Sequence, residues 1–363
     1  MKVTGIRLNP TTPSQLNAEV ETVSKSFPLF YALPSEFGGS MQVIADPFIV
    51  ALLIPSMRLG QTLTVDAPAS PKLLRALPKI MTFYHNWDPT YKMVKVETSP
   101  GSRETHSPLS KVDALFFTGG IDSFYSLTKL TEQNSEHDFT HLIFVHGFDI
   151  KLNDSLLFEK THAALKEIAS RYEKKLVIVK TNLRSVTDEY VSWANCCGGG
   201  MASAALSFNG FFRQIYISSD LGPNERNLPL AIHPDLDPLW STETTNFVHY
   251  LDGVGRVQKA RALADNQIAQ KHLRVCWENR NGAYNCGRCS KCVRTMLALH
   301  LAGALSKFNF PTALTPELVS ALNYDPDPSV ILHTQQIIHE LQQRGENQLA
   351  KALSKATKKP LTG

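Results

Sequence analysis

Four cysteines in one short segment are spaced for metal binding. In VCWENRNGAYNCGRCSKCVRT, Cys286, Cys289 and Cys292 form two nested CxxC steps, and Cys276 precedes them by ten residues. Thiolates two residues apart can turn toward one ion, and four of them complete a closed tetrahedral zinc site of the structural kind. The sequence therefore predicts structural Zn²⁺ held by these four cysteines, in a zinc-binding segment over residues 276–292.

Two other uses of clustered cysteines compete with zinc. A redox CxxC pair needs only two thiols, whereas an iron–sulfur cluster with three close cysteines is a direct competitor. The two remaining cysteines, Cys196 and Cys197, lie outside the cluster, and we expect them to be small buried residues.

A second motif, TGGIDS, has the residue types of a phosphate-binding loop. It follows the apolar run VDALFF and precedes a helical pattern. The two glycines let the backbone approach a charged ligand, and the free amides of the next helix point at phosphate oxygens. We expect Asp122 to cap that helix or to hold Mg²⁺ bridging pyrophosphate oxygens; a tight turn with a helix cap is the alternative interpretation. The predicted nucleotide-binding residues of the loop are Thr118, Gly119, Gly120, Ile121, Asp122 and Ser123.

Strands and helices alternate along the part of the chain that carries TGGIDS. Short apolar runs separated by helical patterns predict a doubly wound, mostly parallel α/β sheet with helices on both faces. In such sheets ligands bind beyond the carboxyl ends of the strands, which is where TGGIDS and Asp149 fall. The predicted strands cover residues 112–117, 142–146, 176–179 and 214–218.

The ends of the chain have a different character. Residues 1–105 mix apolar segments with proline breaks, and we expect an N-terminal α+β accessory domain there. A polar stretch over residues 98–111 is typical of a linker. The second domain then covers residues 106–363 and is expected to be helical after Pro311.

The bulk composition is that of an ordinary globular protein. Of 363 residues 43% are hydrophobic and 19% charged, and the formal charge of +4 is dispersed along the chain, so nucleic acid is neither demanded nor excluded. The apolar stretch Pro47–Met57 is too short to span a bilayer, and the first residues lack a secretion signal. We expect a cytoplasmic protein without a membrane partner, and the sequence leaves a homodimer open.

The two motifs together resemble a known family. TGGIDS resembles the SGGxDS signature of the PP-loop superfamily of ATP pyrophosphatases, which have an adenine nucleotide α-hydrolase-like fold; Thr118 replaces the usual serine. With the downstream C…CGxCxxC, the chain resembles the 7-cyano-7-deazaguanine synthases (the QueC family) over about Val112–Thr295, clearly only at the two ends. The resemblance implies that ATP adenylates a carboxylate such as that of 7-carboxy-7-deazaguanine, and that ammonia then displaces AMP.

Two further candidates come from this resemblance. The run His233, Pro234 and Asp235 stands roughly where the family has a Tyr-Pro-Asp substrate segment, and Lys259 matches a lysine that faces pyrophosphate. The predicted catalytic residues are therefore Asp122, Lys259 and Asp235. A solvated helix face is the alternative for Lys259.

The segment HPDLDPLWST allows two interpretations. Asp235 and Asp237 can bond the donors of a guanine-like base and Trp240 can stack on it, or the segment is a surface turn with a buried tryptophan. The sequence departs from the family at Gly198–Ala202, where a Gly-Arg-Asn run is expected.

The leading functional hypothesis is an enzyme that adenylates a carboxylate, releases pyrophosphate and AMP, and forms a C–N bond. Its acceptor is ammonia or, as understood for relatives in antiviral defence operons, the N-terminal amine of a protein partner, which the added N-terminal residues can hold. The alternatives are a tRNA base-modifying enzyme of the thiolation type and a non-catalytic ATP-binding scaffold.

Overall fold

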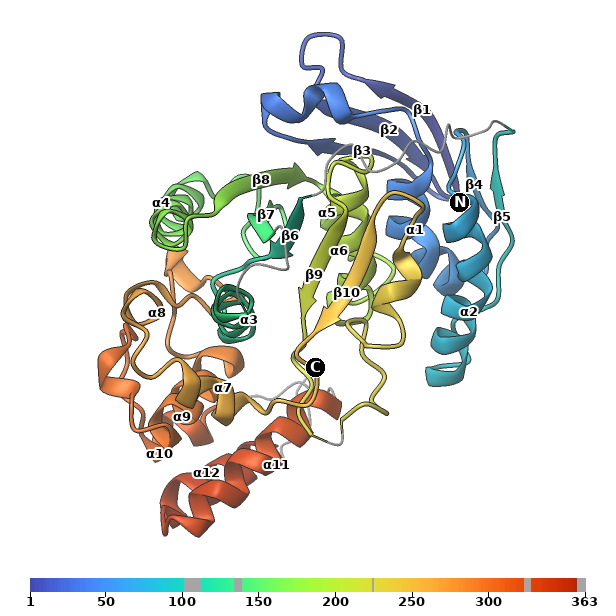
Figure 1. Ribbon diagram of the computed structural model, residues 1–363. Helices are drawn as coiled ribbons and strands as arrows, with labels where there is room; N and C mark the ends of the chain where they lie inside the picture. The colour runs from blue at the N-terminus through green and yellow to red at the C-terminus, as the bar shows by residue number, and fades with distance from the viewer. Residues whose placement is uncertain (101–111, 134–138, 224, 323–327, 358–363) are drawn as a thin grey trace.

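The described residues fold around one mixed sheet of ten strands, in the order β10-β9-β6-β7-β8-β3-β2-β1-β4-β5. The computed structural model describes residues 1–100, 112–133, 139–223, 225–322 and 328–357 (Figure 1). The strands are β1 Lys2–Leu8, β2 Gln15–Glu21, β3 Ser26–Ala32, β4 Leu63–Val65, β5 Val96–Thr98, β6 Asp113–Phe116, β7 Phe139–His146, β8 Lys175–Thr181, β9 Gln214–Ser218 and β10 Asn246–Tyr250.

One half of the sheet is parallel and places the phosphate loop at its centre. Strand β6 pairs in parallel with β7 on one side and with β9 on the other; β8 and β10 extend the two sides. Because the chain goes from β6 to β7 and only later returns to β9, the order reverses between β6 and β9. Ligands of open parallel sheets bind at such a switch point. The mostly parallel α/β sheet expected from the sequence is confirmed, and TGGIDS follows the strand at the switch point.

The N-terminal strands continue the same sheet. Strand β3 pairs antiparallel with β8 through Tyr31 and Ala32, β2 joins β3 to β1 by antiparallel pairing, and β4 and β5 add parallel strands at the far edge. The boundary expected at residue 105 lies in residues 101–111, outside the described residues. The strands of residues 1–100 therefore belong to the same sheet as β6, the strand that precedes the phosphate loop.

Helices cover both faces of the sheet (Figure 1). Helices α1, α2, α5 and α6 pack in one apolar cluster, and the remaining helices from α3 to α12 belong to the other. Their bounds are α1 Asp46–Leu59, α2 Pro71–Trp87, α3 Ile121–Glu132, α4 Ser155–Arg171, α5 Leu183–Thr187, α6 Trp193–Leu206, α7 Arg256–Ala262, α8 Gln267–His272, α9 Ser290–Leu301, α10 Pro316–Ser320, α11 Pro328–Gln343 and α12 Asn347–Thr357.

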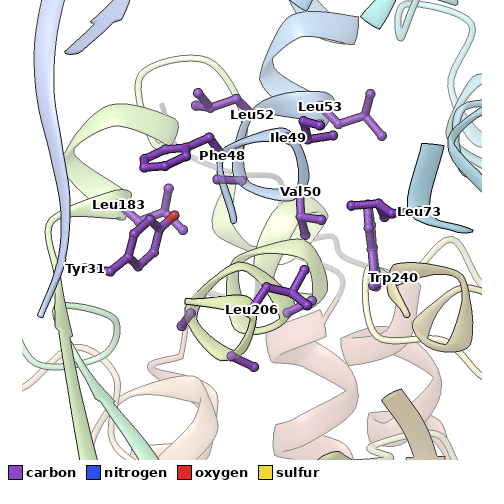
Figure 2. Packing of buried hydrophobic residues seen from close by; sticks show 14 of the residues in the cluster. Tyr31, Phe48, Ile49, Val50, Leu52, Leu53, Leu73, Leu183, Leu206 and Trp240 are labelled. Carbon is purple, nitrogen blue, oxygen red and sulfur yellow. The ribbon is translucent and has the colours of Figure 1, made fainter. Parts of the chain in front are cut away.

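The apolar run that begins at Pro47 forms the central core helix α1. Every residue from Asp46 to Met57 is buried, and α1 packs against the glycine-rich helix α6 (Figure 2). A helix that is apolar all round belongs in a core when it is too short for a membrane. Among the described residues, no helix is long and apolar enough to cross a bilayer.

Trp240 belongs to the same core. Its side chain is fully buried beside Val50 and Leu73 (Figure 2), so the interpretation of HPDLDPLWST as a turn around a buried tryptophan is correct for this residue. The indole N–H of Trp240 has no hydrogen-bond partner among the described residues.

Trp240→Ala is expected to lower the free energy of unfolding by about 3–5 kcal/mol, because it empties a large core position. Trp240→Phe is expected to cost less than half as much, since it keeps the ring packing and removes an unpaired N–H. Chemical denaturation of both variants measures the difference. Equal losses for the two variants would contradict a packing role.

Candidate functional site

The phosphate loop is a tight connection between β6 and α3. Gly119 has φ +80°, a left-handed conformation that favours glycine, and Gly120 is the N-cap of α3. Thr118 is exposed, whereas the hydroxyl of Ser123 donates to the carbonyl of Gly120 at 3.1 Å. Ile121 is buried in the core, so only its backbone amide is left to meet a ligand. The helix N-terminus and its free amides make this loop a suitable anion site.

Asp122 is held by two cations of helix α7. Lys259 Nζ lies 2.9 Å from Asp122 Oδ1, and Arg256 Nη2 lies 3.3 Å from Oδ2. Lys259 is 1% exposed and also donates to the carbonyl of Ser219 at 2.6 Å. Lys259 is therefore not on a solvated helix face, and the structure brings together two of the three predicted catalytic residues. Asp122 is an ion-pair partner and does not cap α3.

The charges around Asp122 keep it ionised. Burial alone would raise the pKa of this carboxyl, but Arg256 and Lys259, with a further contribution from Lys291, hold the pKa of Asp122 well below its usual range. A carboxylate in this state stays available to a divalent cation at neutral pH.

Two buried cations pair with the loop carboxylate, and a third basic residue, Arg274, adjoins the loop. Arg274 contacts it through its backbone: the N–H of Arg274 donates to the carbonyl of Gly119 at 2.8 Å. Arg256, Lys259 and Arg274 are all at least nine-tenths buried. The Nε atoms of both arginines are buried and lack a hydrogen-bond partner among the described residues, and Lys259 uses two of its three donors. Unpaired buried donors cost free energy that an anionic ligand would recover.

The four cysteines form a compact, buried cluster. Their sulfur atoms all lie within 4.8 Å of one another; the Cys276–Cys289 distance is 3.9 Å and the Cys286–Cys292 distance is 4.0 Å. In a tetrahedral zinc site with Zn–S bonds of about 2.3 Å, sulfur atoms lie about 3.8 Å apart. The cluster can therefore hold a metal ion, and it is compatible with structural zinc.

Backbone N–H groups support the cysteine sulfurs, as second-sphere donors do in metal sites. The amide of Cys289 donates to Cys286 Sγ at 3.2 Å, and that of Cys292 donates to Cys289 Sγ at 3.4 Å. Gly287, with φ +66°, makes the turn, and a Cβ there would lie 2.8 Å from the hydroxyl of Thr312. In the CGxC pattern, the glycine is therefore needed for the backbone turn, in addition to the cysteines that can bind metal.

The cysteine cluster and the phosphate loop are mechanically connected through Asn279. The amide of Asn279 donates to Cys276 Sγ at 3.3 Å, its side-chain oxygen accepts from Arg274 Nη2 at 2.6 Å, and its Nδ2 donates to the carbonyl of Asp149 at 2.5 Å. Because Arg274 is bonded to Gly119, this series of hydrogen bonds connects the cysteine cluster to one side of the phosphate loop. Asp149 joins this arrangement through its backbone; a role for its carboxylate stays a prediction.

Asp235 lies apart from the ion pair of Asp122. Its side chain is 43% exposed and pairs with Arg226 at 2.6 Å. Its part in a reaction stays a prediction. The neighbouring Asp237 is fully buried, and His249 Nδ1 lies 2.7 Å from its Oδ2.

The sequence interpretation missed three residues of this region: Arg256, Arg274 and His249. Arg256 lies three residues before Lys259, so the two side chains fall on the same face of a helix. This spacing could have identified Arg256 as a second cation beside Lys259. Arg274 precedes Cys276 by two residues, but nothing local indicates its contact with Gly119. His249 lies in β10, a short strand that was not predicted.

The fold and the site define an α/β protein with a mixed, mostly parallel sheet, a loop rich in buried cations at its switch point and a four-cysteine cluster that can bind metal. No family model, curated protein or solved structure matches the chain.

Proposed function

We propose that this chain is an ATP-dependent enzyme of the PP-loop type that adenylates a carboxylate and transfers the acyl group to an amine. The observation that carries the proposal is the loop at the switch point, where the free amides of α3 lie beside an ionised carboxylate that is paired with two buried cations, Arg256 and Lys259. Such a set of donors suits the charge that builds on departing pyrophosphate.

In the proposed reaction, the phosphates, Mg²⁺ and zinc are each bound by different residues. Lys259 and Arg256 would bind the β and γ phosphates and stabilise pyrophosphate as it leaves. Mg²⁺, which supplies Lewis-acid stabilisation of the phosphate oxygens, would bind Asp122 together with those oxygens. The four cysteines would hold structural zinc and keep the wall formed by Arg274 and Asn279 in place.

The proposed carboxylate is 7-carboxy-7-deazaguanine or a close analogue, on the likeness of the two motifs to the 7-cyano-7-deazaguanine synthases. The acceptor is ammonia or a protein N-terminal amine, and the activated acyl group would serve both. The reaction has two steps. The carboxylate and ATP first give the acyl adenylate and pyrophosphate; the amine then reacts with the acyl adenylate to give the amide, AMP and a proton.

The test is product analysis with purified protein, ATP, Mg²⁺, 7-carboxy-7-deazaguanine and ammonium chloride. We expect AMP and pyrophosphate in equal amounts and a carboxamide or nitrile product by mass spectrometry. A peptide with a free N-terminus, compared with the same peptide acetylated, tests the protein acceptor. Formation of ADP instead of AMP, or no nucleotide turnover with any acceptor, would rule the proposal out.

A further inference from the structure

Unpaired polar atoms gather at the carboxyl ends of β9 and β10. His249 is the penultimate residue of β10, and Asp220 lies two residues beyond the end of β9. His249 Nε2 and Asp220 Oδ1 are buried and have no hydrogen-bond partner in the part of the chain that the structure describes. A buried polar atom without a partner costs free energy that a bound ligand can recover. Both are hydrogen-bond acceptors at the edge where parallel sheets bind ligands, so they suit a ligand that brings N–H donors.

His249 is held in the arrangement of a proton acceptor. Its Nδ1 lies 2.7 Å from Oδ2 of Asp237, and the other oxygen of Asp237 accepts from the amide of His233 at 3.3 Å. The side chain of His249 is 3% exposed and that of Asp237 is fully buried. A carboxylate on Nδ1 orients the ring, directs the lone pair of Nε2 away from itself and stabilises the imidazolium that forms when Nε2 takes a proton.

The two unpaired atoms come from neighbouring parallel strands: His249 is paired with Ile217 and Tyr250 with Ser218, two residues before Asp220. The amide of Ser219 donates to the carbonyl of Tyr250 at 2.9 Å, and the carbonyl of Ser219 accepts from Lys259. Ser219 therefore joins the end of β10 to the ion pair of Asp122.

We propose that Asp220 and His249 form the amine-binding half of the site. Asp220 binds the acceptor as an ammonium ion, which gives one proton to solvent to become the free amine; His249 Nε2 takes the second proton, which the nitrogen loses as it attacks the acyl adenylate. The C–N bond forms, the bond between the acyl carbon and the AMP oxygen breaks, and AMP leaves with its electron pair. This inference rests on the proposed function, because it assigns the second step of that reaction.

The experiment separates the two steps with His249→Gln and Asp220→Asn. ATP–pyrophosphate exchange with 7-carboxy-7-deazaguanine, without an amine, measures adenylation; carboxamide formation with ammonium chloride measures transfer. We expect both variants to keep exchange within about twofold of the unsubstituted protein. We expect His249→Gln to lower the transfer rate at least about 100-fold, and Asp220→Asn to raise KM for ammonium at least about tenfold. His339→Gln and Asp265→Asn, at exposed positions, are matched controls.

Hydroxylamine tests the role of Asp220 separately, because it is an uncharged nucleophile at neutral pH. The Asp220→Asn defect should shrink when hydroxylamine replaces ammonium. Transfer at the unsubstituted rate in His249→Gln, or a parallel loss of exchange and transfer, would overturn the assignment; the second pattern would indicate a packing role. Absence of exchange in the unsubstituted protein would instead defeat the proposed adenylation itself.

Discussion

Asp122→Asn is expected to lower ATP-dependent turnover at least about 1,000-fold, which corresponds to roughly 4 kcal/mol of transition-state stabilisation. The substitution removes the carboxylate that would share Mg²⁺ with the pyrophosphate oxygens and leaves the shape of the loop nearly unchanged. It also leaves Lys259 and Arg256 without their shared counterion. Release of AMP under saturating ATP and Mg²⁺ measures the effect.

The same substitution is expected to tighten binding of inorganic pyrophosphate in magnesium-free buffer. Arg256 and Lys259 then face the anion without the carboxylate of Asp122, so we expect the dissociation constant to fall several-fold while turnover is lost. Bound pyrophosphate should also raise the melting temperature of the variant, because it replaces the missing counterion. Glu132→Gln, at the exposed end of the same helix, is the control and should change neither quantity. Weaker pyrophosphate binding in Asp122→Asn would contradict the arrangement of charges described for the loop.

The parallel half of the sheet was predictable because its signals are local. Each predicted strand from residue 112 to residue 218 overlaps an observed one, and the helix expected from Asp122 is α3. Buried parallel strands form short apolar runs, and the glycines of TGGIDS mark the turn that must follow β6. The spacing of the four cysteines predicted the cysteine cluster in the same way, since three of the four lie within seven residues.

The contacts of Lys259 and His249 were not predictable, because they join distant parts of the chain. Lys259 meets Asp122 across 137 positions, and nothing in the short helix GRVQKARAL distinguishes a buried lysine from a solvated one. Strand β10 has five residues, too few for a clear periodic pattern, so the pairing of His249 with Asp237 was missed. The attachment of β3 to β8 likewise depends on two residue pairs of a long-range antiparallel contact.

Cys289→Ser is expected to abolish stoichiometric metal binding and to lower the melting temperature by at least about 10 °C. Structural zinc contributes about 10–16 kcal/mol of apparent binding free energy in small zinc peptides, and part of that would be lost here. Elemental analysis of the unsubstituted protein should find one zinc per chain. Iron and a brown colour would indicate a cluster instead and would favour the thiolation-type alternative.

Loss of the metal is also expected to weaken ATP binding at the phosphate loop. Cys276 is bonded by Asn279, which holds Arg274, and Arg274 is bonded to Gly119. Cys289→Ser or chelation should therefore weaken ATP binding at least about tenfold at temperatures where the chain is still folded, as judged by circular dichroism. Cys196→Ser is the matched control, because Cys196 is also buried but lies outside the cluster, where its thiol donates to the carbonyl of Ser192 at 3.5 Å. Unchanged ATP affinity in a folded, metal-free chain would show that the loop keeps its geometry without the cluster.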